Sequence, residues 1–305
     1  MTQDPKILIA ETGGERLDKW LVTHFSDYSR AQIQDWIKDG FVTVDGKHEK
    51  ASLKLRGGEA ISVSVPIAPE PPPIAVDIPL TVVHDDPNFA VIDKPAGMVT
   101  HPGAGNPTNT LMNAICGRWS EILNMQNERK GIVHRLDKET SGLIVIAKND
   151  VTQRKLMRQF QARTVKKMYY ALLERPPKTN IGRIEVPIGR DNRDRRRMTP
   201  LREGRPAISE FEVIETFTNG MCLVKFNLLT GRTHQIRVHA AFIGCPLVGD
   251  KTYGFRKQTM KVERMFLHAK ELSFDHPKTG ERLAFESPLP PELEKILRRL
   301  RQMQP

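Results

Sequence analysis

Residues 131–143 read Gly-Ile-Val-His-Arg-Leu-Asp-Lys-Glu-Thr-Ser-Gly-Leu and lead into an apolar run at residues 143–147. A turn glycine and a strand-like entry precede one carboxylate, Asp137, and the bounded apolar run has the composition of a buried strand. The carboxylate therefore lies at a strand-to-loop corner, with Arg135 and Lys138 on either side. Neighbouring positive charge keeps a carboxylate ionised, which suits a nucleophile or general base better than a general acid. An ordinary surface ion pair is the competing interpretation.

Short strands dominate the chain from residue 74 onward. Five runs have strand composition and are bounded by turn residues, at 91–94, 142–148, 167–173, 209–214 and 222–226. Helices are fewer and are predicted at 152–163, 233–243 and 292–301. Many strands with scattered helices favour an α+β domain built on a mostly antiparallel sheet, rather than alternating βαβ units.

A proline-rich segment at residues 66–73, Pro-Ile-Ala-Pro-Glu-Pro-Pro-Pro, marks the clearest seam in the chain. Proline cannot donate a ladder hydrogen bond, and such runs form extended, semi-rigid spacers. We therefore predict a small domain at residues 1–66, a linker at 67–73 and a large domain at 74–305. The length of 305 residues allows two unequal domains and a substantial apolar core.

Two helices and a small sheet are predicted before this seam. Residues 16–25 carry apolar side chains at helical spacing, and a second helix is predicted at 29–39 with Ser29 as its N-cap. Residues 41–46, Phe-Val-Thr-Val-Asp-Gly, predict a strand and a hairpin turn that leads into a second short strand. The alternating run at 61–65 predicts another strand. The charged helix face of this module is either a solvated surface or a contact for RNA.

The chain carries a basic excess. Lys and Arg number 47 against 36 Asp and Glu, so the formal net charge is +11 at pH 7. With 39% hydrophobic and 27% charged residues, the composition is that of a folded protein and argues against wholesale disorder. The excess favours a polyanionic partner, nucleic acid first and an anionic membrane surface second.

Cysteine usage and the first residues bear on the compartment. Cys116, Cys222 and Cys245 stand far apart and form no CxxC pair, which excludes a disulfide framework and a Cys-rich zinc site and suits a reducing cytosol. Residues 1–20 lack a basic segment followed by a long apolar run, so we expect no secretory signal. No stretch approaches about 18 consecutive apolar residues. We expect a cytoplasmic protein with no membrane span.

A second polar patch, residues 229–239, reads Leu-Thr-Gly-Arg-Thr-His-Gln-Ile-Arg-Val-His. We expect Thr233 to cap the helix that follows, with His234 and Arg237 on one face of it. The spacing of His234 and His239 does not suit one metal ion, and no acidic or Cys ligand stands at metal spacing, so we expect no metal site. Because a guanidinium pairs with a carboxylate through two bonds, an arginine that reaches a buried carboxylate is the more economical interpretation.

Two further basic stretches could contact RNA. Residues 163–171 lead cations into a strand whose Tyr169 and Tyr170 must face opposite sides, so one belongs to the core and the other could stack on a base. Residues 189–205 hold seven arginines against three acidic residues, which suits phosphates, although a solvated loop without a partner is the alternative. The motifs GxxxxGK[ST], GxSxG and HExxH are absent from the sequence, which sets several enzyme classes aside.

The N-terminal segment resembles the S4 RNA-binding domain. The resemblance rests on the pattern RLDKWL…SRAQIQDWIKDGFVTVDGK within residues 16–47, where Ser29 and Arg30 open the second helix. It implies RNA contacts from the second helix and the hairpin, including one from Arg30.

The large segment resembles the RluA family of RNA pseudouridine synthases. The matching segments are DKPAG at 93–97, HRLDKETSG at 134–142, KMYYA at 167–171 and TGRTHQIRVH at 230–239. Finer agreement, with members that act on large-subunit (23S) ribosomal RNA, lies at 27–30, 77–80, 101–106 and 246–250. The resemblance implies the pseudouridine synthase fold and isomerisation of uridine to 5-ribosyluracil, without a metal or an organic cofactor. It also implies 23S stem-loops and pre-50S particles as partners, and a monomer.

The resemblance also assigns roles to residues. Asp137 corresponds to the family's essential aspartate, which acts on the ribose either by attacking C1′ or by abstracting the C2′ proton. Arg237 would pair with Asp137 and hold it ionised and oriented. Tyr169 would stack on the target base, and Arg135 would fill the space left by the extruded nucleotide. The other candidate RNA-binding residues are His134, Arg232, Arg30, Lys167, Arg195, Arg196 and Arg197.

Two alternatives come from other classes of protein. A non-catalytic RNA-binding or ribosome-assembly factor would keep the S4-like module but lose the aspartate or arginine motif, and both motifs are intact. An S4-containing RNA methyltransferase would need a glycine-rich loop after the first strand of a βαβ unit, and the sequence has none. Within the same chemistry, the target could be another ribosomal uridine or a tRNA uridine.

Overall fold

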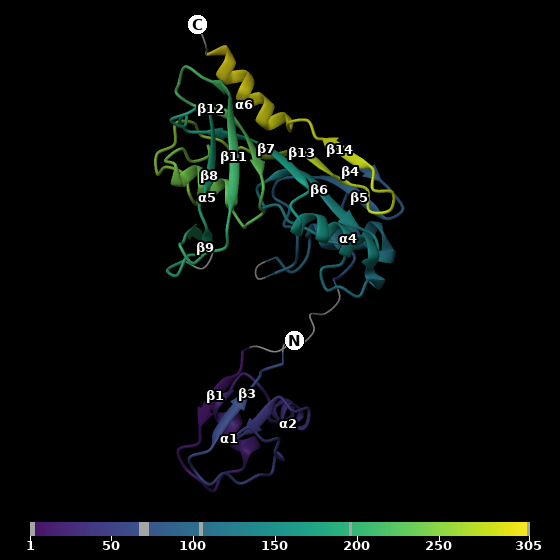
Figure 1. The fold of residues 1–305 in the computed structure, drawn as a ribbon, viewed down its shortest axis with the longest axis vertical. Helices are drawn as coiled ribbons and strands as arrows, with labels where there is room; N and C mark the ends of the chain where they lie inside the picture. The colour runs from purple at the N-terminus through teal and green to yellow at the C-terminus, as the bar shows by residue number, and fades with distance from the viewer. Residues whose placement is uncertain (1–3, 67–72, 104–105, 195–196, 304–305) are drawn as a thin grey trace. The chain divides into compact units, whose positions relative to one another are not determined.

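The computed structural model describes residues 4–66, 73–103, 106–194 and 197–303. The chain divides into two compact units, Met1–Pro71 and Pro72–Pro305 (Figure 1). Each unit has apolar clusters made entirely of its own residues. Among the described residues, no helix is both long enough and apolar enough to cross a membrane.

Two helices and a three-stranded antiparallel sheet form the N-terminal unit. The helices are α1 (Leu17–His24) and α2 (Arg30–Lys38). The sheet has the order β1 (Lys6–Ile9), β3 (Ala60–Val63), β2 (Val42–Val44). One apolar cluster fills the unit and includes both predicted helical stripes, namely Leu17, Trp20, Leu21, Phe25, Ile33, Trp36 and Ile37.

The predicted start of α2 is confirmed, whereas the predicted hairpin is wrong. The Gln32 N–H donates to the Ser29 hydroxyl, and the Gln32 side chain accepts from the Ser29 N–H, which completes a capping box. After the turn, the chain forms an isolated bridge between Val44 and Lys47 instead of a second hairpin strand, and β2 pairs with β3. Tertiary pairing therefore overrides the local strand that the turn predicts.

One nine-stranded sheet runs through the large unit. Its order is β4-β5-β6-β13-β7-β12-β11-β8, with β14 paired to β13, and the separate pair β9 and β10 forms a short second sheet. All neighbours are antiparallel except β6 and β13, which confirms the predicted α+β class. The strands are β4 (Thr81–Asp85), β5 (Phe89–Lys94), β6 (Ser141–Ala147), β7 (Lys166–Leu173), β8 (Ile181–Glu185), β9 (Ile188–Arg190), β10 (Met198–Pro200), β11 (Ile208–Thr216), β12 (Cys222–Leu228), β13 (Leu267–Asp275) and β14 (Arg282–Glu286).

Helices cover parts of this sheet. They are α3 (Leu111–Arg118), the 3₁₀ helix η1 (Ser120–Asn124), α4 (Asp150–Gln161), α5 (Gln235–Phe242) and α6 (Pro291–Gln302). The prediction starts α4 two residues too late, because the Asn149 side chain accepts from the Thr152 N–H and caps the helix there.

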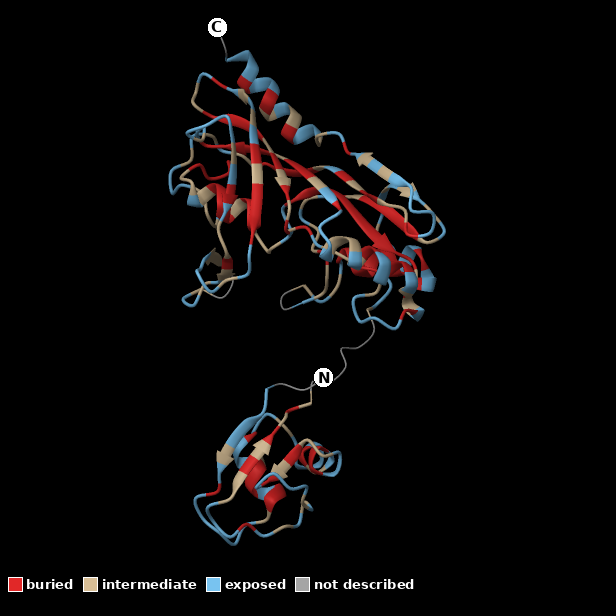
Figure 2. Ribbon diagram, in the orientation of Figure 1, coloured by how far each residue is buried: buried red, intermediate tan, exposed pale blue. Residues whose placement is uncertain are grey.

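Apolar side chains cover the central strands on both faces. Every residue of β6 is buried, and successive residues enter different clusters. Ile144 packs in the cluster that contains Leu111 of α3, whereas Val145 packs with Leu156 of α4. Figure 2 shows the same burial along the central strands of the large unit. A strand covered on both sides has no polar face, which explains the unbroken apolar run at 143–147.

Candidate active site

The loop of residues 134–140, which carries Asp137, is fixed to the residues that follow β5. The Gly97 N–H donates to the Lys138 carbonyl at 2.8 Å, and the Thr140 N–H donates to the Asp137 carbonyl at 3.1 Å. Bonds to the carbonyls of Asp137 and Lys138 therefore hold the aspartate in a turn that opens directly into β6.

Gly142 permits the close pairing of β6 with β13 just after this loop. Its φ is +112°, a conformation that L-residues rarely adopt, and a Cβ there would collide with the Ala269 carbonyl oxygen. Gly142 and Ala269 are register partners in the parallel pairing of the two strands. The final glycine of HRLDKETSG is thus required by packing of the sheet that supports the loop.

Lys94, the last residue of β5, is fully buried beneath the same loop. Its ammonium donates to the carbonyls of Pro95 at 2.8 Å, Met98 at 2.9 Å and Lys138 at 3.4 Å. Burial lowers the pKa of Lys94 to about 7, although the charge of Asp137 acts in the opposite direction. The DKPAG segment therefore holds the backbone of the aspartate loop through the bond from Lys94 to the Lys138 carbonyl.

The free energy of unfolding of the wild type should rise with pH above about 7, and we expect the Lys94→Met variant to lose this rise. The unfolded lysine keeps its ordinary pKa of 10.5, so between about 7 and 10.5 the unfolded chain binds the extra proton, and the wild-type free energy of unfolding rises with pH. One such group contributes a slope of at most about 1.4 kcal/mol per pH unit. Urea unfolding of both proteins across this window measures the difference, with the exposed Lys138→Met as control. Parallel curves for wild type and Lys94→Met would contradict the expectation.

Arg237 of α5 lies between two carboxylates. Its Nε and Nη2 donate to Asp250 at 2.7 and 2.9 Å, and its Nη1 donates to Oδ2 of Asp137 at 3.3 Å. The Asp250 side chain is completely buried, whereas that of Asp137 keeps 16% of its surface exposed. The predicted contact between Arg237 and Asp137 is present, but the two-bond pairing is made with Asp250. Asp250 fixes the guanidinium, and the guanidinium faces the more accessible carboxylate.

Arg237 and Asp250 keep each other ionised. Burial alone would raise the pKa of Asp250, but the hydrogen bonds and the charge of Arg237 lower it below its ordinary value. Burial opposes the charge of Arg237, but Asp250 and then Asp137 raise the pKa of the guanidinium above its usual range. Both groups therefore stay ionised at neutral pH, and their mutual pairing makes a buried ion pair tolerable.

The start of α5 differs from the prediction. Thr233 does not cap the helix; His234 is the N-cap residue, with a left-handed backbone at φ +57°. The Gln235 side chain accepts the backbone N–H of Arg232 in the preceding turn, and no side chain caps the first turn of the helix. His234 consequently lies off the helix face that carries Arg237. It still faces the site, with Nε2 at 3.9 Å from Oδ2 of Asp137.

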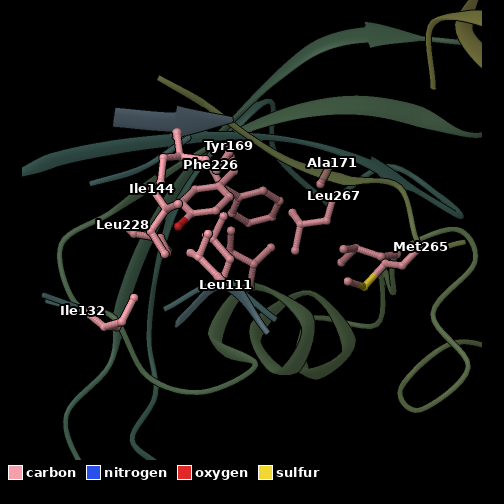
Figure 3. Close-up of a cluster of buried hydrophobic side chains, with 14 of the residues drawn as sticks. Leu111, Ile132, Ile144, Tyr169, Ala171, Phe226, Leu228, Met265 and Leu267 are labelled. Carbon is pink, nitrogen blue, oxygen red and sulfur yellow. The ribbon is translucent and has the colours of Figure 1, made fainter. Parts of the chain in front are cut away.

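Tyr169 lies in β7 with its ring in an apolar cluster that includes Phe226 (Figure 3). Its residue surface is 7% exposed. Burial and then the charge of Asp137 raise the pKa of the phenol, so it stays protonated. Tyr170 packs in a different cluster, which confirms that the two neighbours face opposite sides. Stacking of Tyr169 on the target base stays a prediction.

Three predicted RNA-binding residues are engaged within the large unit. His134 accepts from the Val145 N–H at 3.1 Å, and burial lowers its pKa to about 3. The Lys167 ammonium donates to the Thr230 carbonyl at 3.4 Å, and burial, followed by the charge of Arg232, lowers its pKa to about 8. Arg232 itself donates to a backbone carbonyl at 3.2 Å. RNA contacts by these three residues stay predictions.

Two predicted RNA-binding arginines of the large unit are exposed. Arg135 belongs to the aspartate loop, and Arg197 precedes β10. Arg195 and Arg196 lie outside the described residues. The exposed cations are therefore found both beside Asp137 and on the segment between β9 and β10.

Arg30 of the N-terminal unit binds a buried carboxylate. Its Nε and Nη2 donate to Asp18 at 3.1 and 2.8 Å, and Arg16 and Gln34 bond the same side chain. The Asp18 side chain is completely buried, but 46% of the Arg30 side-chain surface stays exposed. Arg30 thus joins α2 to α1, and an RNA contact by its exposed part stays a prediction.

Three residues of this site have no role in the sequence interpretation: Lys94, Asp250 and Tyr253. Lys94 and Asp250 lie inside quoted segments, at 93–97 and 246–250. Each is a charged residue close to an apolar run, and this was the sequence signal that could have singled them out. Tyr253, whose hydroxyl lies 2.8 Å from Nδ1 of His234, carries no such signal.

Residues 88–242 match the family described as RNA pseudouridylate synthase, and residues 15–61 match the S4 domain. The ribosomal large subunit pseudouridine synthase D of Pseudomonas aeruginosa is 41% identical over 304 residues, covering 96% of this chain and 94% of that protein. An uncharacterized RNA pseudouridine synthase of Bacillus subtilis is 42% identical over 292 residues, covering 95% of this chain and 96% of that protein.

A solved structure also resembles the chain. The human RNA pseudouridylate synthase domain containing 1 matches with a TM-score of 0.58 at 26% identity, over 75% of this chain and 98% of that one. The matched family segment contains Asp137, Tyr169 and Arg237, and ends before Asp250.

Proposed function

The chain belongs to the RNA pseudouridylate synthase family and carries an S4 domain, and from this premise we propose that it isomerises uridine to pseudouridine in large-subunit (23S) ribosomal RNA. The resemblance predicted from the sequence is confirmed, and the chain is an RNA pseudouridine synthase. The names of the relatives support ribosomal RNA as the substrate. The proposal places an RNA-binding domain at 1–66, a linker at 67–73 and the catalytic domain at 74–305, in a cytoplasmic monomer.

In the proposed reaction Asp137 acts at the ribose of a uridine that has left its stack. The bond from C1′ to N1 breaks, the uracil rotates, and a bond from C1′ to C5 forms. The C5 proton is released and N1 gains one, so substrate and product have the same composition. Asp137 either attacks C1′ or takes the C2′ proton, and in both cases it must be ionised beforehand.

The contact between Asp137 and Arg237 carries this proposal. A nucleophile or base needs a charged carboxylate that is accessible to substrate yet fixed in direction. Arg237 supplies the opposite charge at 3.3 Å, and Asp250 holds Arg237 from behind through two shorter bonds. A surface ion pair, the competing interpretation of Asp137, would not need a completely buried second carboxylate.

Extrusion of the target base costs roughly a few kcal/mol, less in RNA loops than in a paired stem. Cations of the loop between β9 and β10 and of the S4 domain would offset this cost through phosphate contacts. Arg135 beside Asp137 would occupy the place of the extruded nucleotide, and Tyr169 would contact the uracil. This division assigns affinity to many cations and chemistry to one carboxylate.

Mapping pseudouridines tests the substrate assignment. Carbodiimide primer extension on 23S rRNA from a strain that lacks this gene should show one or more lost signals, which return with the wild-type gene but not with Asp137→Asn. Loss of signals from tRNA alone, with 23S rRNA unchanged, would reject the large-subunit assignment while leaving the chemistry in place.

Removal of residues 1–66 should weaken binding of long 23S fragments more than binding of a minimal stem-loop. The S4 domain contributes phosphate contacts outside the target loop, and a long RNA offers more of them. The large unit should survive the truncation because its apolar clusters contain none of these residues. Filter binding of the two RNAs to both proteins measures the effect, and equal losses on both RNAs would contradict it.

A further inference from the structure

We propose that His234 and Tyr253 are a positioning pair for Asp137, in which Tyr253 fixes the proton of His234 on Nε2 and thereby aims a neutral N–H donor at the carboxylate. The inference deepens the proposed function, since it rests on Asp137 as the group that acts at the ribose. It further connects the carboxylate to the basic segment between β9 and β10.

The backbone at His234 is unusual and directs its ring. His234 is the N-cap residue of α5 and has φ +57°, a left-handed conformation that is strained for a non-glycine residue. This conformation places the ring between two partners: Nε2 lies 3.9 Å from Oδ2 of Asp137, and Nδ1 lies 2.8 Å from the Tyr253 hydroxyl. Backbone strain of this kind is typical of functional sites, where a side chain must keep one orientation.

The hydrogen bonds of Tyr253 favour one position for the proton of His234. The Met198 N–H donates to the Tyr253 hydroxyl oxygen at 2.8 Å. The hydroxyl oxygen then accepts from Met198, and the hydroxyl proton is free to be donated to Nδ1 of His234. In that arrangement Nδ1 is an acceptor and carries no proton. The single proton of a neutral imidazole is then on Nε2, which faces Asp137.

Burial keeps this imidazole neutral. Burial lowers the pKa of His234, and the charge of Arg237 adds to that effect, although Asp137 opposes it. A neutral donor orients a carboxylate without protonating it, so Asp137 keeps the negative charge that the reaction needs. Removal of either donor of Asp137 should therefore affect turnover rather than RNA affinity.

The two donors approach the same oxygen of Asp137. Both Nη1 of Arg237 and Nε2 of His234 face Oδ2, at 3.3 and 3.9 Å. We assign Oδ1 as the oxygen that meets the ribose. The longer of the two distances leaves room for the histidine bond to tighten when RNA enters, as catalytic hydrogen bonds commonly do.

Tyr253 also links this pair to the basic segment. The guanidinium of Arg197 lies over its ring at 5.4 Å, that of Arg237 lies over it at 4.9 Å, and the N–H of Met198 in β10 bonds its hydroxyl. Cation–π contacts of this kind hold an aromatic ring in place. A phosphate bound at the exposed Arg197 would therefore be separated only by the Tyr253 ring from His234, the residue that faces Asp137.

Nitrogen NMR of the labelled full-length protein tests the proton position without any RNA. The wild type should show a protonated Nε2 and an unprotonated Nδ1 for His234, and Tyr253→Phe should show a mixture of both tautomers. A protonated Nδ1 in the wild type would overturn the proposal whether or not the reaction assignment is correct.

Two amide variants at position 234 separate positioning from packing. The Gln side chain can present an N–H near the place of Nε2, whereas the shorter Asn mimics Nδ1. We expect His234→Gln to keep kcat within about threefold of wild type, and His234→Asn to lose about tenfold or more, the rate equivalent of one ordinary hydrogen bond. KM for a C5-tritiated rRNA fragment should change less than twofold in both. Equal kcat values for the two variants, or a change confined to KM, would overturn the proposal.

Tyr253→Phe completes the test. Alone it should lower kcat about two- to fivefold, in proportion to the fraction of His234 that loses its Nε2 proton, and in the His234→Gln background it should have little further effect, because the tyrosine acts through the histidine. Additive losses would reject the pair. Tyr170→Phe, which removes a phenol oxygen in a different cluster, is the matched control, and thermal melts exclude unfolding as the cause. If Asp137→Asn retained activity in the same assay, the proposed function would fail instead, which keeps the two failures distinct.

Discussion

Asp137→Asn should lower turnover by about 10⁴-fold or more while changing the dissociation constant for RNA less than about threefold. An amide can neither attack C1′ nor take the C2′ proton, since it carries no negative charge. Phosphate contacts carry most of the affinity, and one carboxylate adds none. Tritium release from a C5-labelled 23S fragment measures the rate, and filter binding measures the affinity.

Glu139→Gln is the matched control for this substitution. It removes the same charge from an exposed side chain of the same loop, and it should leave the rate near that of the wild type. Comparable rates for Asp137→Asn and the wild type would show that the carboxylate is only a structural partner of Arg237.

Arg237→Met should lower kcat by about 10²- to 10³-fold, the usual effect of removing one well-placed charged group from an active site. The substitution leaves Asp137 without its main donor and leaves Asp250 charged and buried without its partner. We therefore also expect the variant to lose about 3–5 kcal/mol of unfolding free energy. Tritium release and urea unfolding measure the two effects separately.

A second substitution distinguishes the two consequences. Adding Asp250→Asn to Arg237→Met removes the unpaired buried charge, so the double variant should regain much of the lost stability but none of the rate. If activity returned together with stability, the arginine would be needed only to fold the site, and its assignment to Asp137 would be rejected.

The sequence identifies the residues that act in the reaction, but it does not identify the residues that surround and hold them. The segments at 134–142 and 230–239 contain Asp137 and Arg237, and the resemblance alone assigned the contact that the structure contains. Their spacing does not reveal Asp250, because that contact depends on how the loop after α5 folds back on the helix. A contact made by an irregular loop leaves no periodic pattern, so it could not be predicted from one sequence.

Strand predictions failed where polar residues interrupt the pattern. β13 occupies the middle of the sheet, but its sequence contains Lys270 and Glu271, and the pairing with β7 shifts register between Ala269 and Glu271. A bulge of this kind breaks the alternation that identifies a strand. The left-handed turn at His234 was missed for a related reason, since nothing in the local sequence favours φ above zero there.

The position of β13 has a consequence for the order in which the protein becomes active. β13 lies between β6 and β7 in the sheet, although it comes about a hundred residues after both in the chain. A ribosome that is still synthesising this chain therefore holds an unfinished sheet, with the strands on either side of the gap already exposed but unable to join. Until residue 275 has left the exit tunnel, the aspartate loop has no completed support. The aspartate loop is therefore completed only after β13 has been made and has inserted between β6 and β7.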